Sequence, residues 1–166
     1  MDLVKHAGTL GRLVGNLQSL EFLLRLFLQK QPSARPLGMA PGKDVYSYPV
    51  GSWLPENDLT SYDSLGQLID KYNAQPHVTQ VDRSIVEVRD ALAHGRVSGT
   101  DDSTQPLRLM KFSRPCAGRV RVEYNEELSP EWFSTEIRRV LDAVKGVVDS
   151  LRRLEGEAKS GNKTDT

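Results

Sequence analysis

Apolar positions recur at three- and four-residue spacing in four stretches of the chain, and this spacing predicts four helices. The first is expected from Asp2 to about Gln31, the second from Ser61 to about Asn73, and the third from Thr79 to Gly95. The fourth begins at Ser129-Pro130-Glu131, which combines an N-cap, a proline at the first helical position and an acid in the first turn, and runs to about Glu155.

The periodicity changes to alternation between the third and fourth helices. Residues 107–112 and 119–124 alternate like strands and predict an antiparallel β-hairpin, with Arg96–Ser98 as a third strand. Pro, Gly and Ser dominate 32–57 and predict a long loop, whereas 156–166 lack large apolar residues and predict a disordered tail. The expected fold is mainly α: one domain over 1–155, a four-helix up-down bundle with a hairpin insert at 96–125.

The first helix carries two features that this bundle must accommodate. Its seven-residue repeat places an acid, Glu21, on the core seam, where a carboxylate is costly unless it is paired. Glu21 is either at the rim of the core or directed at Arg89. A stripe of small residues on one side predicts close approach by another backbone, in the bundle or across a dimer. The repeat comprises Leu3, Ala7, Leu10, Val14, Leu17, Leu24 and Leu28, and the stripe Gly8, Gly11, Gly15 and Ser19.

Composition excludes several classes of protein. The 166 residues have a formal net charge of zero, so no overall field favours nucleic acid or membrane. Cys116 is the single cysteine, and no apolar run approaches the roughly 18 residues of a membrane span. The start, MDLVKHAG, lacks a signal-peptide core. We expect a cytoplasmic protein that does not enter membranes. The three scattered histidines predict no metal site, and we expect no cofactor.

The end of the third helix holds the one plausible catalytic centre. Asp90 and His94 are four residues apart and share a helix face, while Arg89 lies about 140° from His94. A histidine at a helix C-terminus also has a structural explanation, because its cationic form suits the helix dipole. An imidazole that exchanges protons and a guanidinium that holds phosphate would together suit metal-independent RNA cleavage. In that reading Asp90 orients the imidazole of His94.

The whole phrase, VEVRDALAHGRV, resembles the signature of HEPN-superfamily domains, with Arg89, Asp90 and His94 at the three polar positions of the motif. The resemblance implies an endoribonuclease of toxin–antitoxin, phage-defence or RNA-processing type, acting as a homodimer on RNA, with an antitoxin or regulatory protein as a further partner. Arg96 stands where some HEPN toxins carry a modified tyrosine. Non-catalytic members also exist, so a dimeric binding or scaffolding module is the alternative, and a ligand sensor built on the loop around Trp53 is a third.

The hairpin adds a candidate RNA surface. Its cations face Glu123 alone, and they form either a solvated sheet face or a phosphate-binding patch. Arg96 extends the set from the end of the third helix. The candidate RNA-binding residues are Arg96, Arg108, Lys111, Arg119 and Arg121, with Arg114 in the turn.

Overall fold

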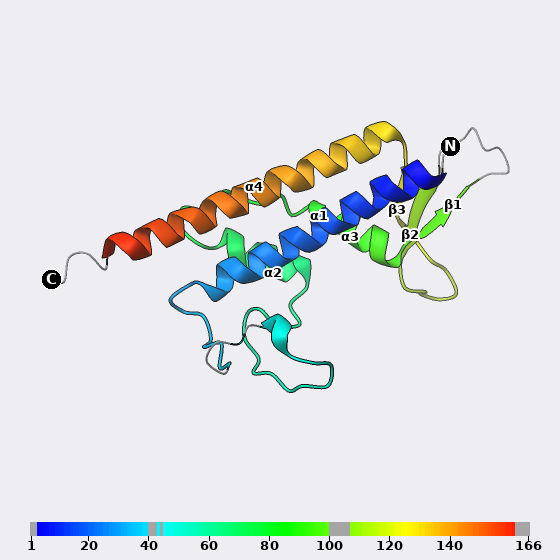
Figure 1. Ribbon diagram of the computed structural model, residues 1–166. Helices are drawn as coiled ribbons and strands as arrows, with labels where there is room; N and C mark the ends of the chain where they lie inside the picture. The colour runs from blue at the N-terminus through cyan, green and yellow to red at the C-terminus, as the bar shows by residue number, and fades with distance from the viewer. Residues whose placement is uncertain (1–2, 40–42, 44, 100–106, 162–166) are drawn as a thin grey trace. The chain divides into compact units, whose positions relative to one another are not determined.

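A computed structural model describes residues 3–39, 43, 45–99 and 107–161 (Figure 1). The described part is mainly helical with one small antiparallel sheet, as the sequence predicted. No helix in it is long and apolar enough to cross a membrane. The elements in order are α1 (Leu3–Gln29), the short 3-10 helix η1 (Val45–Ser47), α2 (Leu65–Asn73), α3 (Ile85–His94), β1 (Arg96–Ser98), β2 (Arg108–Phe112), β3 (Val122–Glu127) and α4 (Pro130–Gly161).

The chain divides into two compact units, where the sequence predicted one domain over 1–155. The first unit comprises Met1–Leu20 and Val81–Lys145, and the second comprises Glu21–Gln80 and Gly146–Thr166. The boundaries fall within α1 and within α4, so each unit contains part of both long helices. The first unit also contains α3 and the sheet, and the second contains the long loop and α2.

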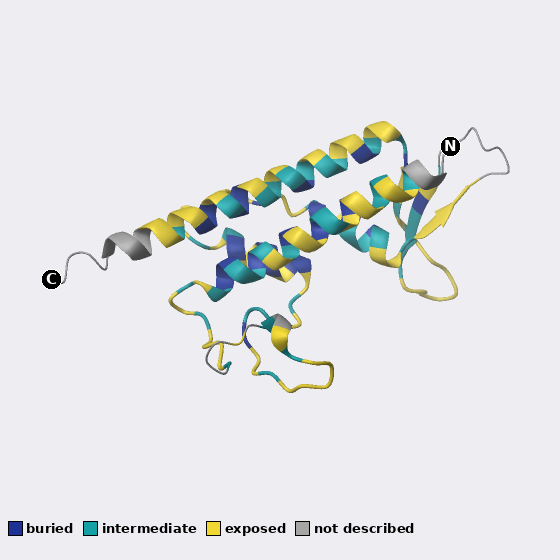
Figure 2. Ribbon diagram, viewed as in Figure 1, coloured by how far each residue is buried: buried dark blue, intermediate teal, exposed yellow. Residues whose placement is uncertain are grey.

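The buried stripe of α1 differs from the predicted repeat. Leu17, Leu24 and Leu28 are buried as expected, but Leu20 is fully buried and Val14 is 36% exposed. Figure 2 shows buried, intermediate and exposed residues along α1. The stripe therefore passes through Leu20 and leaves the neighbouring Glu21 beside it, with its side chain 30% exposed. A leucine is available one position before the acid, and burying it avoids the cost of desolvating a carboxylate.

The glycine stripe of α1 meets nothing in the described chain. A Cβ built on Gly8, Gly11 or Gly15 would have no described atom within 4 Å. Close approach within the described part of one chain is therefore not the reason for these glycines. Approach by a second copy, the other alternative, stays a prediction.

In the second unit, α2 begins at a capping box rather than at the predicted Ser61. Ser64 caps the helix: its Oγ accepts a hydrogen bond from the backbone N–H of Gln67, and the Gln67 side chain accepts one from the backbone N–H of Ser64. The apolar residues Leu65, Leu68, Ile69 and Tyr72 recur at helical spacing and are all buried. The hydroxyl of Tyr72 is 2.8 Å from Ser150 Oγ of α4, so this buried polar pair is satisfied.

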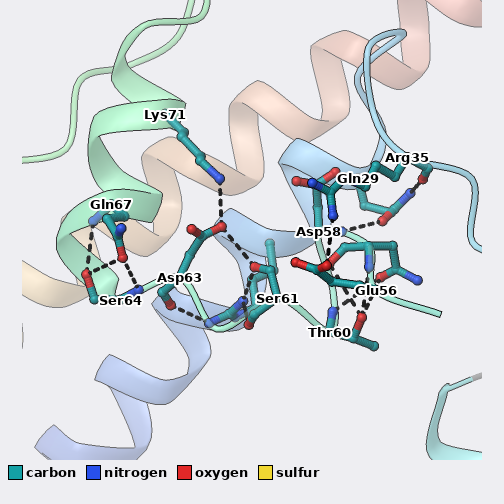
Figure 3. Close-up of polar contacts among 12 residues, drawn as sticks. Gln29, Arg35, Glu56, Asp58, Thr60, Ser61, Asp63, Ser64, Gln67 and Lys71 are labelled. Carbon is teal, nitrogen blue, oxygen red and sulfur yellow. Dashed lines mark hydrogen bonds and ion pairs between the residues drawn. The ribbon is translucent and has the colours of Figure 1, made fainter. Parts of the chain in front are cut away.

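Side chains fasten the segment before α2 to its surroundings in the second unit (Figure 3). Arg25 of α1 donates to the carbonyls of Ser61, at 2.8 Å, and Asp63, at 2.7 Å, and also pairs with Glu21 at 3.0 Å. The carboxylate of Asp63 accepts hydrogen bonds from Lys71 Nζ, at 2.7 Å, and Ser61 Oγ, at 2.9 Å. The hydrogen bond from Lys71 is the main cause that holds the pKa of Asp63 below its ordinary value.

In the first unit, α3 begins at Ile85, six residues later than predicted. A turn precedes it: the carboxylate of Asp82 accepts hydrogen bonds from the backbone N–H of Ser84, at 2.9 Å, and from its hydroxyl, at 2.6 Å. Asp and Ser bind nearby backbone groups in this way instead of continuing a helix. The buried side chains of this stretch are Val81, Ile85, Val88 and Ala91. Leu92, four residues after Val88, is only partly buried.

The sheet confirms the predicted hairpin and third strand. Its order is β1-β2-β3 with both pairs antiparallel, and Arg96 pairs with Met110 and Lys111 with Tyr124. The second strand of the hairpin, predicted at 119–124, lies further along the chain at Val122–Glu127, and the pairing register shifts between Lys111 and Phe112.

Helix α4 begins as predicted and ends later. The hydroxyl of Ser129 accepts a hydrogen bond from the backbone N–H of Trp132 at 3.1 Å, and Pro130 is the first helical residue. The helix continues past Glu155 to Gly161, whereas the rest of the predicted tail, 162–166, lies outside the described residues.

We predict that Asp63→Asn lowers the free energy of unfolding at pH 7 by about 0.5–1.5 kcal/mol, because it removes the charge that Lys71 binds. The pKa of Asp63 is lowered in the folded state, so this stabilisation is present above the unfolded pKa and is lost as the pH falls through the folded value. Urea unfolding at pH 7 and at pH 2–3 should show the difference shrinking in acid. Asp149→Asn, at a site 64% exposed, is the matched control and should change stability by less than about 0.5 kcal/mol. A constant difference at both pH values would contradict the assignment.

Candidate functional site

The motif residues lie at the C-terminal end of α3 in the first unit. Arg89 Nη1 donates to Asp90 Oδ1 at 3.1 Å, and both side chains are 36% exposed. His94 is the last residue of the helix and is exposed. Among the described residues no hydrogen bond joins Asp90 to His94, so Asp90 holds the guanidinium instead of the predicted imidazole. Arg89 is therefore paired with Asp90, and His94 is open to solvent.

This arrangement leaves both groups able to meet a phosphate. A guanidinium has five N–H donors, and the single bond to Asp90 leaves Arg89 with donors to spare. An exposed imidazole can exchange protons with a bound substrate or with water near neutral pH. The site has the parts for general acid–base chemistry beside a phosphate-binding cation.

Gly95 connects the motif to the sheet. A glycine directly after a helix often adopts a left-handed conformation, but Gly95 is extended, with φ −79° and ψ 176°. A Cβ at this position would lie 2.3 Å from the carbonyl oxygen of Ala91, 2.9 Å from Leu109 Cδ1 and 2.9 Å from the carbonyl oxygen of Met110. Glycine is required here by the close approach of α3 to β2, not by a positive φ.

A polar groove of about 510 Å³ lies beside the motif in the first unit. It brings Asp90 together with Lys111 and Arg121, two of the predicted RNA-binding residues. Arg89, His94, Arg96, Arg108 and Arg119 do not line it. The lining residues are Arg83, Ser84, Val86, Glu87, Asp90, Lys111, Arg121, Val122, Glu123 and Tyr124.

Four further polar residues of the groove, Arg83, Ser84, Glu87 and Tyr124, were not predicted from the sequence. Tyr124 had a signal, since it ends the predicted second strand of the hairpin. Burial is the main cause that raises the pKa of its hydroxyl. A hydrogen bond with Trp132 lowers that pKa, whereas Glu136 and Glu126 raise it. Tyr124 therefore offers the groove a neutral hydroxyl at physiological pH.

The hairpin cations are more closely balanced by acids than predicted. Lys111 and Arg121 lie 3.4 and 3.6 Å from carboxylate oxygens of Glu123. Arg108 lies 3.7 Å from Glu127, which the longer β3 brings into the sheet. The groove itself contains three cations and three acids. Arg121 is 82% exposed, so its pair with Glu123 is weak and a phosphate can compete for this cation.

The remaining predicted residues occupy separate places. The guanidinium of Arg96 lies 5.9 Å from the centre of the Phe112 ring. Arg119 belongs to the hairpin turn, where its backbone pairs with that of Cys116. Glu21 belongs to the second unit and binds Arg25, and its predicted coupling to Arg89 stays a prediction.

Comparisons add no assignment to this geometry. No protein-family model, curated protein or solved structure matches the chain. Within the described residues, no group of three or more His, Cys, Asp or Glu side chains is placed to hold a metal ion.

We predict that Gly95→Ala lowers the free energy of unfolding by about 1–3 kcal/mol, because the new Cβ overlaps a backbone oxygen that cannot move cheaply. Gly11→Ala is the matched control: it lies in α1 with open space around its Cβ, and should stabilise the protein by about 0.5–1 kcal/mol. Chemical denaturation of the two variants and the parent measures both signs. Equal effects of the two substitutions would refute the close approach.

Proposed function

We propose that the chain is a HEPN-type, metal-independent endoribonuclease. The observation that carries this proposal is the Arg89–His94 pair at the exposed end of α3, next to a groove that contains Asp90, Lys111 and Arg121. The resemblance of the motif to the HEPN signature suggests which reaction the site performs. The groove offers a surface on which an RNA backbone can lie. The proposed fold is the four-helix up-down bundle of that superfamily, formed by α1 to α4.

In the proposed reaction the ribose 2′-oxygen attacks its own adjacent phosphorus, and the bond from phosphorus to the 5′-oxygen breaks. His94 moves a proton between these oxygens, which leaves a cyclic phosphate and a 5′-hydroxyl. Arg89 offsets the charge that gathers on the nonbridging oxygens of the phosphorane. Asp90 holds the guanidinium of Arg89 in place through the 3.1 Å bond.

The proposal includes a homodimer in the cytoplasm. Arg89 and His94 lie too far apart around one helix to form a complete site easily, and two chains bring four such groups together. The exposed Val97 of β1, which is 48% exposed two residues after Gly95, offers apolar surface at this end of α3. A toxin or phage-defence effector of this type is controlled by an antitoxin or regulatory protein, which is the further partner proposed.

The second candidate is a non-catalytic dimeric module that binds or scaffolds. The observation in its favour is the charge balance of the groove, where each hairpin cation lies near an acid. In this reading Arg89 and His94 stabilise an interface, and no RNA is cleaved. The two candidates predict different effects of removing the His94 imidazole. The enzyme would lose its RNA cleavage, whereas the activity of the binding module would stay intact.

We predict that His94→Ala lowers RNA cleavage by about 10²- to 10⁴-fold with little change in RNA affinity, because the imidazole acts in the chemical step. The double variant Lys111→Ala with Arg121→Ala should behave in the opposite way. It should flatten the slope of log affinity against log salt by about 1.4, at about 0.7 for each single-strand phosphate contact, and keep turnover at saturating RNA. Cleavage of end-labelled RNA in EDTA measures turnover, and filter binding measures affinity.

Two outcomes decide between the candidates. A His94→Ala protein that cleaves at the parental rate defeats the enzyme proposal, because the nuclease then uses another site or is a contaminant. No cleavage by the parent, together with an intact dimer, favours the binding module. His77→Ala, at an exposed histidine outside the motif, is the matched control and should cleave normally.

We predict that Val97→Asp weakens self-association at least about tenfold, because it puts a charge on apolar surface at the proposed interface. Val50→Asp, at a fully exposed loop position, is the matched control and should leave association unchanged. Sedimentation velocity over a micromolar concentration range measures the dissociation constant. A parent protein that is monomeric throughout this range counts against the composite site.

A further inference from the structure

A second and larger groove lies in the first unit, away from the motif. Its volume is about 730 Å³, within the range of small-molecule sites. It is lined by one side of α1, the first half of α4 and the junction that precedes α4. The lining residues are His6, Thr9, Arg12, Leu128, Pro130, Phe133, Ser134, Ile137, Arg138, Leu141, Asp142 and Lys145.

The groove is long along α4. Its α4 residues recur at three- and four-residue spacing from Pro130 to Lys145, so the lined stripe extends for about 22 Å at 1.5 Å per residue. A stripe of this length suits an extended chain that lies along α4.

The apolar part of the groove lies toward the start of α4. Leu128 and Phe133 are buried, and Ile137 is partly buried. The ring of His6 meets that of Phe133 edge to face, with centroids 5.3 Å apart and an angle of 76° between the planes. This arrangement gives one end a firm apolar floor.

The charged part lies further along the same helix. Arg138 and Lys145 come from α4, and Arg12 comes from α1. The one acid of the groove, Asp142, lies 3.4 Å from Lys145, and both side chains are more than half exposed. Arg12 and Arg138 have no ion-pair partner among the residues that the structure describes. The groove therefore has an apolar end and a cationic end.

We propose that this groove binds a single-chain amphiphile with a carboxylate head, such as a fatty acid. The acyl chain lies on Phe133 and Ile137 toward Leu128, and the carboxylate lies between Arg12 and Arg138. Burial of the chain supplies affinity, and the guanidinium groups of Arg12 and Arg138 select the negative head. The site uses no motif residue, so this proposal can be tested independently of the proposed ribonuclease.

The test is calorimetric titration of the full chain with dodecanoate below its micelle concentration, beside dodecanol as the neutral probe of equal length. Dodecanoate should bind with one site per chain, and dodecanol should bind at least tenfold more weakly. Arg12→Ala with Arg138→Ala should weaken dodecanoate binding roughly 10- to 100-fold and leave dodecanol binding unchanged. Arg35→Ala with Arg152→Ala, two arginines 65% and 76% exposed outside the groove, is the matched control and should change neither.

Photolabelling places the ligand. A dodecanoate that carries a diazirine near its chain end should label the peptide 128–145 and be displaced by excess dodecanoate. His94→Ala should bind as the parent does, which keeps this result separate from the ribonuclease test. The proposal is overturned by non-saturating binding, by equal affinity in the arginine double variant, or by label elsewhere in the chain. It is also overturned if Arg138→Glu breaks a dimer, for then a second copy occupies the groove.

Discussion

The space at Gly95 is the constraint on which the candidate site depends. The carbonyl oxygen of Ala91 and the β2 strand approach this residue so closely that no side chain fits. The chain therefore passes from α3 to β1 through Gly95 alone. His94 is the last residue of α3, and Arg96 is the first residue of β1. The hairpin that follows is fixed against α3 by the same approach, and the polar groove lies between these elements.

Pairing of charges decides what the site presents to a ligand. Asp90 holds Arg89, and Glu123 lies near both Lys111 and Arg121. Ion pairs that are open to solvent contribute little to stability. These acids therefore position the cations, and a phosphate that displaces an acid still gains most of the free energy of binding to the cation. The molecule has no net charge, and any affinity for RNA must come from such local exchanges.

The two grooves of the first unit differ in chemistry. One is balanced in charge and adjoins the motif helix, and the other joins an apolar floor to the cations Arg12, Arg138 and Lys145. In the second unit the polar side chains hold the segment before α2 in place. Arg25 and Asp63 bind backbone and side-chain groups of the segment before α2, and the buried Tyr72 meets Ser150. These contacts fasten a long connection that has little regular structure of its own.

The sequence by itself determined the structural features that depend on residues close together along the chain. Ser129-Pro130 marks the start of α4, alternation marks the strands, and the spacing of Leu65, Leu68, Ile69 and Tyr72 marks the buried face of α2, because caps and periodicity act over three or four residues. It also identified Arg89, Asp90 and His94 as the candidate centre. Tertiary structure decided which partner each group meets. Leu20 rather than Glu21 enters the core, Asp90 binds Arg89 rather than His94, and Gly95 is needed for space rather than for a positive φ. Several partners were possible for each group on local grounds, and only the packing of segments distant in the sequence, such as β2 against the end of α3, selects one.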